Sequence, residues 1–211
     1  MKTLRLSILL LAAAATCPAQ QWEFGGLGGG GFLSDVAVAG PVGSATAGFQ
    51  TGAAFGAFFG HNTYNHIGGE LRYAYLQNNL QLSSGGSSVS FAGVAHVLHY
   101  DLILRTNPRN SRVQFFAAIG GGMKVFRGTG TEAAYQPLSQ YGYFTKTQVL
   151  KPMASVGGGM KFIIARRVFL RTEFRDYITA FPKDLIAPAP GAKFGSILHD
   201  FVPMVGLSYE F

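Results

Sequence analysis

The sequence predicts an all-β fold, an eight-stranded antiparallel up-and-down transmembrane β-barrel, preceded by an export signal. Apolar and polar residues alternate with a period of two along most of the chain. The connections between these segments alternate between short and long, and no segment after the first twenty residues has the composition of a membrane-spanning helix. With 211 residues, 48% hydrophobic and only 13% charged, the chain suffices for one domain but carries few charges for a surface that faces water.

The first residues form a signal for export. A positively charged start is followed by a ten-residue apolar run from Leu6 to Ala15, which is too short to span a membrane. Small residues at Cys17 and Ala19 occupy the positions that a signal peptidase reads, so we expect residues 1–19 to be cleaved and residues 20–211 to form the mature barrel domain. A lipoprotein signal with an acylated Cys17 is the alternative, although the preceding residues lack the leucine that such signals carry.

Net charge and cysteine content exclude several classes of protein. The charge of +7 loses two units once the signal is removed with Lys2 and Arg5, and the remaining excess is spread along the chain rather than clustered as in nucleic-acid-binding proteins. The single cysteine, Cys17, excludes both a disulfide scaffold and a thiolate zinc cluster. We therefore expect no nucleic-acid partner, no metal site and no cofactor.

The C-terminal segment shows the alternation most clearly. From Ile197 to Phe211 the odd-numbered positions are almost all apolar, whereas the even-numbered ones include Asp200 and Glu210. A strand with this pattern presents one face to an apolar environment and the other to a polar one. Eight such segments follow one another along the chain: residues 21–33, 46–60, 67–80, 89–105, 112–126, 148–164, 167–181 and 197–211.

The connections between these segments alternate in length. Short ones span 61–66, 107–111 and 165–166, and long ones rich in Gly, Ser and Pro span 34–45, 81–88, 127–147 and 182–196. This is typical of barrels in the outer membrane of Gram-negative bacteria, which have tight periplasmic turns and longer outer loops. Each segment exceeds the roughly 9–11 residues that a tilted strand needs to cross the lipid. A closed barrel also satisfies backbone groups for which lipid offers no partners, so we expect outer-membrane lipid against the apolar face.

The end of the chain resembles the C-terminal signal that the outer-membrane assembly machinery recognises. That signal is a glycine, two residues, an aromatic, any residue and a terminal aromatic, which Gly206, Tyr209 and Phe211 match. The segments 157–161 and 170–177 are similar to the penultimate hairpin of the small OmpA-type outer-membrane β-barrels. The resemblance implies a place in the cell outer membrane and contact with the assembly machinery during biogenesis. It implies no particular activity, because proteins of one fold differ in function.

If the apolar faces contact lipid, the opposite faces carry charged side chains into the barrel. The inward set has six residues of each sign: Glu23, Glu70, Arg72, Asp101, Lys124, Lys151, Lys161, Arg171, Glu173, Arg175, Asp200 and Glu210. Eight strands leave an interior just wide enough for side chains, and an unpaired buried charge costs several kcal/mol, so these charges should pair. We expect a largely plugged lumen with an ion-pair network of Glu70, Arg72, Asp101, Lys161, Arg171, Glu173 and Arg175.

Other motif matches have simpler explanations than a binding or catalytic site. Residues 26–31 fit the dinucleotide pattern GxGxxG, but no helix follows, and glycines let a barrel strand bend and approach its neighbours. His96 and His99 point to opposite faces of a strand, which argues against a metal pair. His99 and Asp101 share the inward face, but they fall near the periplasmic end, whereas barrel proteases work at the outer rim.

Aromatic residues and prolines give further expectations about the membrane boundaries. Aromatic belts should form from Trp22, Phe24, Phe169, Tyr209 and Phe211 at the periplasmic end, and from Tyr141, Tyr143, Phe144, Tyr177 and Phe181 at the outer end. Pro152 and Pro203 predict bulges near the outer interface, because a closed barrel has no free edge. On the apolar face, Asp176 and His199 should lie near an interface, since polar groups are costly deeper in the lipid.

The sequence therefore predicts a non-enzymatic outer-membrane barrel with an ion-paired lumen and a structural or surface-interaction role, the latter through loops 127–147 and 182–196. A narrow channel for small solutes is the first alternative, because small inward residues such as Gly120, Gly122, Gly157 and Gly159 leave space. The second alternative is a soluble exported barrel that binds a ligand. Such a barrel would turn its apolar side chains inward, around a cavity.

Overall fold

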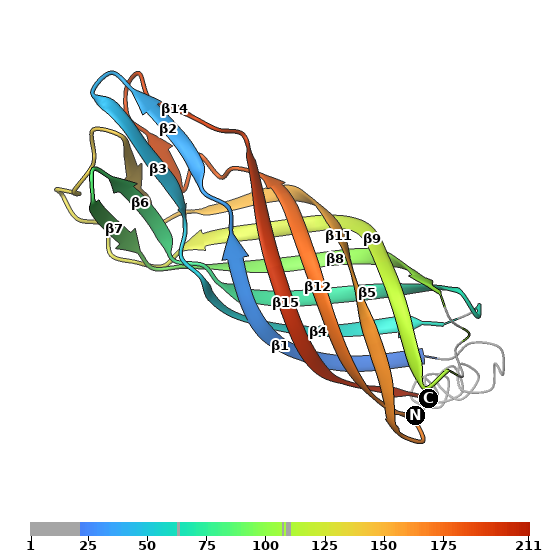
Figure 1. Ribbon diagram of the computed structural model, residues 1–211. Helices are drawn as coiled ribbons and strands as arrows, with labels where there is room; N and C mark the ends of the chain where they lie inside the picture. The colour runs from blue at the N-terminus through green and yellow to red at the C-terminus, as the bar shows by residue number, and fades with distance from the viewer. Residues whose placement is uncertain (1–21, 63, 107, 109–110) are drawn as a thin grey trace, which may run out of the picture.

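A computed structural model describes residues 22–62, 64–106, 108 and 111–211, and eight of its strands close into an antiparallel barrel (Figure 1). The predicted eight-stranded barrel is confirmed, while the predicted signal 1–19 lies outside the described residues. The barrel strands are β1 (Trp22–Leu33), β4 (Gly52–His61), β5 (Ile67–Gln77), β8 (Gly93–Arg105), β9 (Val113–Gly128), β11 (Gln148–Ala165), β12 (Val168–Ala180) and β15 (Ile197–Glu210). In the described part of the chain, no helix has the length and apolar character needed to cross a membrane.

The strands follow one another around the barrel in the order β1-β15-β12-β11-β9-β8-β5-β4, so the wall closes where β1 meets β15. One end of the barrel has three short connections, at residues 62–66, 106–112 and 166–167, and the chain ends there at Phe211 (Figure 1). We call this the short-turn end and the opposite one the long-loop end. At 10 to 18 residues, most of the barrel strands exceed the length required to cross a bilayer.

The alternation read from the sequence places the two kinds of side chain on opposite sides of the wall. On β15, Val205 and Leu207 are 52% exposed, whereas Met204, the residue before Val205, lies on the opposite face and is buried. Every barrel strand carries large apolar side chains on the outside, including Phe24, Phe55, Leu71, Leu98, Ile119, Val156, Phe174 and Val205. Arginines and glutamates lie inside, so the arrangement is the reverse of that in a soluble barrel with an apolar cavity.

The composition of the long connections suggested irregular loops, but parts of them form strands of two further sheets at the long-loop end. One sheet has the order β14-β2-β3-β6-β7 and the other pairs β10 with β13 (Figure 1). Their strands are β2 (Val36–Gly40), β3 (Gly43–Phe49), β6 (Leu80–Ser84), β7 (Ser87–Phe91), β10 (Gly142–Phe144), β13 (Ile186–Pro188) and β14 (Lys193–Phe194). The predicted strands 46–60, 67–80 and 89–105 each divide, since the chain breaks pairing at residues 50–51, 78–79 and 92 when it passes from barrel to outer sheet.

The outer sheets and the long-loop half of the barrel share one apolar core. Val38 and Leu82 of the five-stranded sheet belong to the same buried cluster as Leu76 and Phe126 inside the barrel. The solvent face of that sheet instead carries small polar residues such as Thr46 and Ser83. The period of two thus continues into the outer sheets, and burial of their apolar face holds them on the barrel mouth.

The predicted bulges at Pro152 and Pro203 are wrong. Both prolines keep a continuous register with one neighbouring strand, Pro152 opposite Met123 and Pro203 opposite Phe174. On the other side of each proline the ladder has a gap: β1 and β15 do not pair between residues 29 and 32, and pairing of β11 with β12 begins only at Met153. Each proline, which has no N–H to donate, therefore lies where the pairing is interrupted. Neither strand needs the extra residue of a bulge to accommodate it.

The predicted outer aromatic belt is also largely wrong. Tyr141, Phe144, Tyr177 and Phe181 are buried in the core, and only Tyr143 of that set is exposed, at 40%. At the short-turn end, Phe24, Tyr209 and Phe211 are exposed and Trp22 is partly exposed, but Phe169 is buried inside the barrel. Tyr177 and Phe169 point inward because they share the odd-numbered face of β12 with the charged residues.

Candidate functional site

The centre of the lumen contains two glutamates and two arginines from β5 and β12. Glu70 accepts hydrogen bonds from Arg72 Nε at 2.9 Å and from Arg171 Nη1 at 2.7 Å. Glu173 accepts from Arg171 Nε at 2.9 Å and binds Arg72 through both of its oxygens, with Arg72 Nη2 to Oε2 at 2.9 Å. Each carboxylate thus bridges both guanidiniums, and all four side chains are shielded from solvent.

This four-residue cluster spans the full width of the barrel. In the ring of eight strands, β5 and β12 are four strands apart in either direction, so they lie on opposite walls. Charged side chains from opposite walls can meet only if the interior is narrow enough to be filled by side chains. The guanidinium of Arg171 is further enclosed by two rings, Phe58 at 4.3 Å and Phe116 at 4.5 Å from their centroids.

Further ion pairs lie along the lumen on both sides of this cluster. Towards the long-loop end, Arg175 donates to Asp101 at 2.6 Å, and Asp101 also contacts His99 Nδ1 at 3.0 Å. Towards the short-turn end, Lys161 donates to Glu23, which also accepts a hydrogen bond from Asn62. The pairs Arg175–Asp101 and Lys161–Glu23 also join strands that are not neighbours in the ring.

The long-loop half of the lumen holds one ion pair in apolar surroundings. Lys124 Nζ lies 2.5 Å from Asp200 Oδ2, and both side chains are fully buried. The ammonium group sits 4.7 Å from the centroid of the Phe126 ring, which in turn stacks on Phe49. With Phe181 beside Phe49, these aromatic side chains close the lumen where the outer sheets begin.

All seven residues that the sequence assigned to a lumen network lie inside the barrel, and each makes an ion pair there. Lys161 is separate from the central cluster, because its partner is Glu23. Glu23, Lys124 and Asp200 belong to the inward set but not to the assigned network, and Lys151 and Glu210 are only partly buried. Arg105 and Asn62, which bind each other near the short-turn end, were missed, although Arg105 lies on the inward odd-numbered face of β8.

Glycines on the inner wall provide the space that these side chains occupy. A Cβ added at Gly120 would lie 2.3 Å from Asp101 Oδ1, and one added at Gly157 would lie 2.7 Å from Arg175 Cδ. The same substitutions would also collide with backbone of the neighbouring strand, at 2.1 and 2.2 Å. The two Gly-Gly-Gly-Met-Lys segments therefore serve one purpose, close strand approach beside a charged side chain of the neighbouring strand.

Polar side chains on the outer wall are bonded to each other. His199 Nδ1 lies 2.8 Å from Asp176 Oδ2, a contact that the sequence did not predict. His96 Nδ1 lies 2.8 Å from the Tyr73 hydroxyl. Such pairing lowers the cost of polar groups next to lipid. In the described residues, no group of three or more His, Cys, Asp or Glu is arranged to hold a metal ion.

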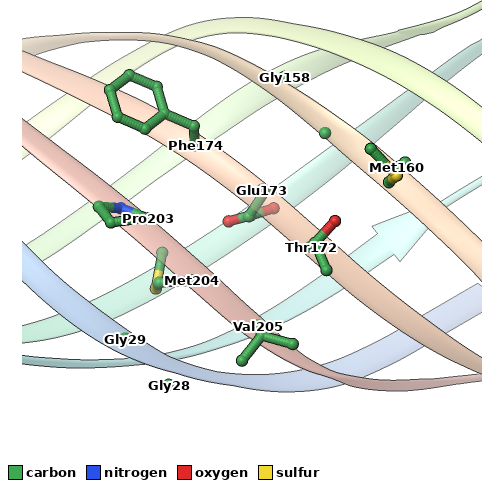
Figure 2. Close-up of a pocket in the computed structure, with 11 residues that line it drawn as sticks. Gly28, Gly29, Gly158, Met160, Thr172, Glu173, Phe174, Pro203, Met204 and Val205 are labelled. Carbon is green, nitrogen blue, oxygen red and sulfur yellow. The ribbon is translucent and has the colours of Figure 1, made fainter.

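A hollow of about 490 Å³ lies on the wall across β1, β15, β12 and β11 (Figure 2). Its lining is largely apolar or backbone, with Phe174, Pro203 and Val205 on the outer side. Glu173 is the only ionisable residue of the lining, and its carboxylate is held on the lumen side by Arg72 and Arg171. The hollow therefore offers no free charged group to a ligand.

Of the three residues that match the assembly signal, Gly206 and Tyr209 lie on β15, and Phe211 follows its last residue. Gly206 approaches β1 so closely that an added Cβ would lie 1.9 Å from the carbonyl oxygen of Gly26. Tyr209 and Phe211 are about half exposed on the outer wall, with ring centroids 6.4 Å apart. Phe211 also contacts Phe59 of β4, at 6.5 Å.

Comparison with known proteins identifies the fold rather than a close relative. No protein-family model matches the sequence, and no curated protein matches it. Among solved structures, outer membrane protein OprG from Pseudomonas aeruginosa is 13% identical with a TM-score of 0.59, over 92% of this chain and 96% of that one. Neisserial surface protein A is 10% identical with a TM-score of 0.55, over 90% of this chain and 97% of that one. The chain therefore has the fold of the small eight-stranded outer-membrane β-barrels.

Proposed function

We propose that this protein is a non-enzymatic outer-membrane barrel whose lumen is plugged and whose role is structural or carried by its outer sheets. The observation that carries the proposal is the reversal of polarity across the wall, with Arg72 and Arg171 buried inside and apolar side chains such as Leu207 exposed outside. An exposed apolar surface that covers all eight strands is unusual for a protein in water, but it matches the hydrocarbon of a bilayer. The short-turn end would then face the periplasm and the outer sheets the exterior.

The filled lumen favours a plug over a channel. The central cluster crosses the barrel from wall to wall, and the aromatic side chains around Phe126 fill the space above it. The room that inward glycines leave is occupied by side chains such as Asp101 and Arg175. A conducting path would require several buried ion pairs to separate, and breaking even one such pair costs about 3–5 kcal/mol.

The same burial supports a role without catalysis. His99 and Asp101 are in contact at 3.0 Å, as a base and its orienting carboxylate would be, but both side chains are fully buried. Asp101 is also bound by Arg175. A substrate that needs either group would have to enter the filled part of the lumen.

Surface interaction is the natural role of the long-loop end. The five-stranded sheet projects its polar face from the barrel, and the segment around Tyr135, which is 79% exposed, extends beyond the paired strands. Loops held on a rigid barrel commonly carry binding functions.

In this proposal Gly206, Tyr209 and Phe211 act earlier, during assembly. Phe211→Ala should therefore lower the folded fraction of the protein in cells more than it lowers refolding of the purified protein.

Two measurements test the proposal in sequence. On gels, the protein folded in detergent should migrate faster before boiling than after; a protein found in soluble periplasm without this shift would contradict a membrane barrel. Folded protein in planar bilayers should then show no steady conductance, with an open porin as positive control. Reproducible channel steps that vanish in Arg171→Met or Glu173→Gln, but persist in the loop variant Asp184→Asn, would establish a channel instead.

A further inference from the structure

Three exposed arginines gather at the short-turn end. Arg166 and Arg167 form the two-residue connection between β11 and β12. Arg112 precedes β9, and its carbonyl accepts a hydrogen bond of 3.1 Å from Ile163 N at the end of β11. The carbonyl of Arg167 accepts one of 2.9 Å from Glu210 N on β15. These backbone bonds hold the three arginines together on one side of the rim, at the ends of β9, β11 and β12.

These arginines have no acid to neutralise them within the described residues. None of the three takes part in an ion pair there, unlike the arginines of the lumen. Glu210, whose backbone N–H bonds to Arg167, is partly buried, and its carboxylate accepts a hydrogen bond of 3.2 Å from Asn62. This part of the rim is therefore a site of positive charge.

A hollow of about 500 Å³ lies beside this turn. It is lined by Ala165, Arg166, Arg167, Val168 and Tyr209. It therefore combines two guanidinium side chains, the phenol ring of a half-exposed tyrosine and small apolar side chains. Guanidinium groups bind phosphate oxygens in pairs of parallel hydrogen bonds, which a single ammonium group cannot do.

The hollow lies at the boundary between the apolar wall and the polar rim. Ile164, two residues before Arg166, is 56% exposed, and Leu207, two residues before Tyr209, is 52% exposed. The aromatic residues that mark the same boundary continue from Tyr209 through Phe211 and Phe59 to Trp22, which stacks on Phe59 at 4.9 Å. Tyrosine and tryptophan favour the headgroup level of a bilayer, so the hollow should lie at that level.

We propose that the hollow at Arg166, Arg167 and Tyr209 binds the phosphate headgroup of an anionic phospholipid in the leaflet next to the short-turn end. The site rests on the proposed membrane location of the barrel. The guanidinium groups would hold the phosphate while Ile164 and Leu207 contact the acyl chains. Apolar contacts directly above the charged groups favour a lipid over a free phosphate ion. Arg112 adds charge at the edge of the site without lining it.

The test is native mass spectrometry of the folded protein in detergent with graded phosphatidylglycerol or phosphatidylcholine. Each arginine near an anionic headgroup contributes roughly a fivefold gain in affinity, so phosphatidylglycerol should bind at least about tenfold more tightly than phosphatidylcholine. In Arg166→Gln/Arg167→Gln this preference should fall to about twofold or less. The matched control Lys183→Gln/Lys193→Gln removes the same charge at the long-loop end and should keep the preference. Arg166→Lys/Arg167→Lys should retain part of it.

The gel shift separates the two proposals. If no variant, nor the parent protein, shows a heat-sensitive folded band, the barrel proposal itself is wrong. If the folded band is present but phosphatidylglycerol binds no better than phosphatidylcholine, only the lipid site is wrong. The site is also wrong if both double Gln variants lose the preference equally, or if inorganic phosphate displaces the lipid. Should the Arg166→Gln/Arg167→Gln variant not fold, the preference of the parent protein and its loss at about 1 M salt decide, because the screening length there is about 3 Å.

Discussion

Arg72 and Glu173 extend from opposite walls of the barrel, and at its centre the two terminal guanidinium nitrogens of Arg72 bind the two carboxylate oxygens of Glu173. Eight strands make the lumen narrow enough for only two side chains to join strands on opposite sides of the ring. The contact makes each partner dependent on the other, since neither is exposed to solvent.

Removal of one charge from the central cluster should destabilise the barrel strongly. Glu173→Gln leaves Arg72 and Arg171 with a single carboxylate, Glu70, and loss of one partner of a buried ion pair costs about 3–5 kcal/mol. The free energy of unfolding, measured in vesicles from the urea dependence of the gel shift, should fall by that order. The exposed Asp184→Asn should change it by less than about 0.5 kcal/mol. Equal effects of the two substitutions would contradict the buried cluster.

The Lys124–Asp200 pair should behave differently when both partners are replaced. Lys124→Met alone leaves the buried Asp200 without its partner and should lower stability by about 3–5 kcal/mol. Lys124→Met with Asp200→Leu removes both charges from apolar surroundings and should regain most of that loss. A double-mutant cycle on urea unfolding measures the coupling. Additive losses in the two single variants would show that the side chains do not interact.

The triple glycines should differ in their tolerance to alanine. A Cβ at Gly122 would lie 2.1 Å from the carbonyl oxygen of Leu98, so Gly122→Ala should cost about 1–3 kcal/mol through overpacking. The adjacent Gly121 faces outward, and its nearest contact would be 3.3 Å. Gly121→Ala should therefore have little effect in the same unfolding measurement. Equal tolerance at both positions would contradict the close approach of β9 to β8.

Limited proteolysis of intact cells should cut first near Tyr135. This residue lies in an exposed segment without paired backbone, whereas the hairpin of β6 and β7 is held in a sheet. Chymotrypsin added outside should produce one early cleavage after Tyr135, which mass spectrometry identifies. Cleavage that requires permeabilised cells would place the long-loop end in the periplasm and reverse the proposed orientation.

The barrel itself was predictable because each wall position is decided by a period of two. The inward positions of Glu70 and Arg171 follow from that period alone. Which acid meets which base was not predictable, since contacts such as Arg72–Glu173 depend on how the closed ring brings β5 and β12 face to face. Lys161 illustrates the difference, because its inward position was expected but its partner, Glu23, lies three strands away.

The outer sheets were missed for a related reason. Their strands are short, and Gly, Ser and Pro in the connecting segments are typical of loops. Pairing between segments far apart in the sequence, such as β14 with β2 through Phe194 and Val38, holds them together. Local patterns contain no information about such contacts. The aromatic assignments were wrong where strand position was used without strand face, as at Tyr177.

The central claim is that lipid contacts the outer wall, and spin labels on single cysteines test it most directly. The chain from residue 20 onward has no cysteine, so cysteines at Val205, Leu207 and Met204 can be labelled one at a time in vesicles. We expect labels at Val205 and Leu207 to collide with oxygen dissolved in the lipid but not with a water-soluble nickel complex, and the label at Met204 to be shielded from both. Nickel access at Val205 and Leu207, with Met204 in a lipid-like cavity, would contradict the account.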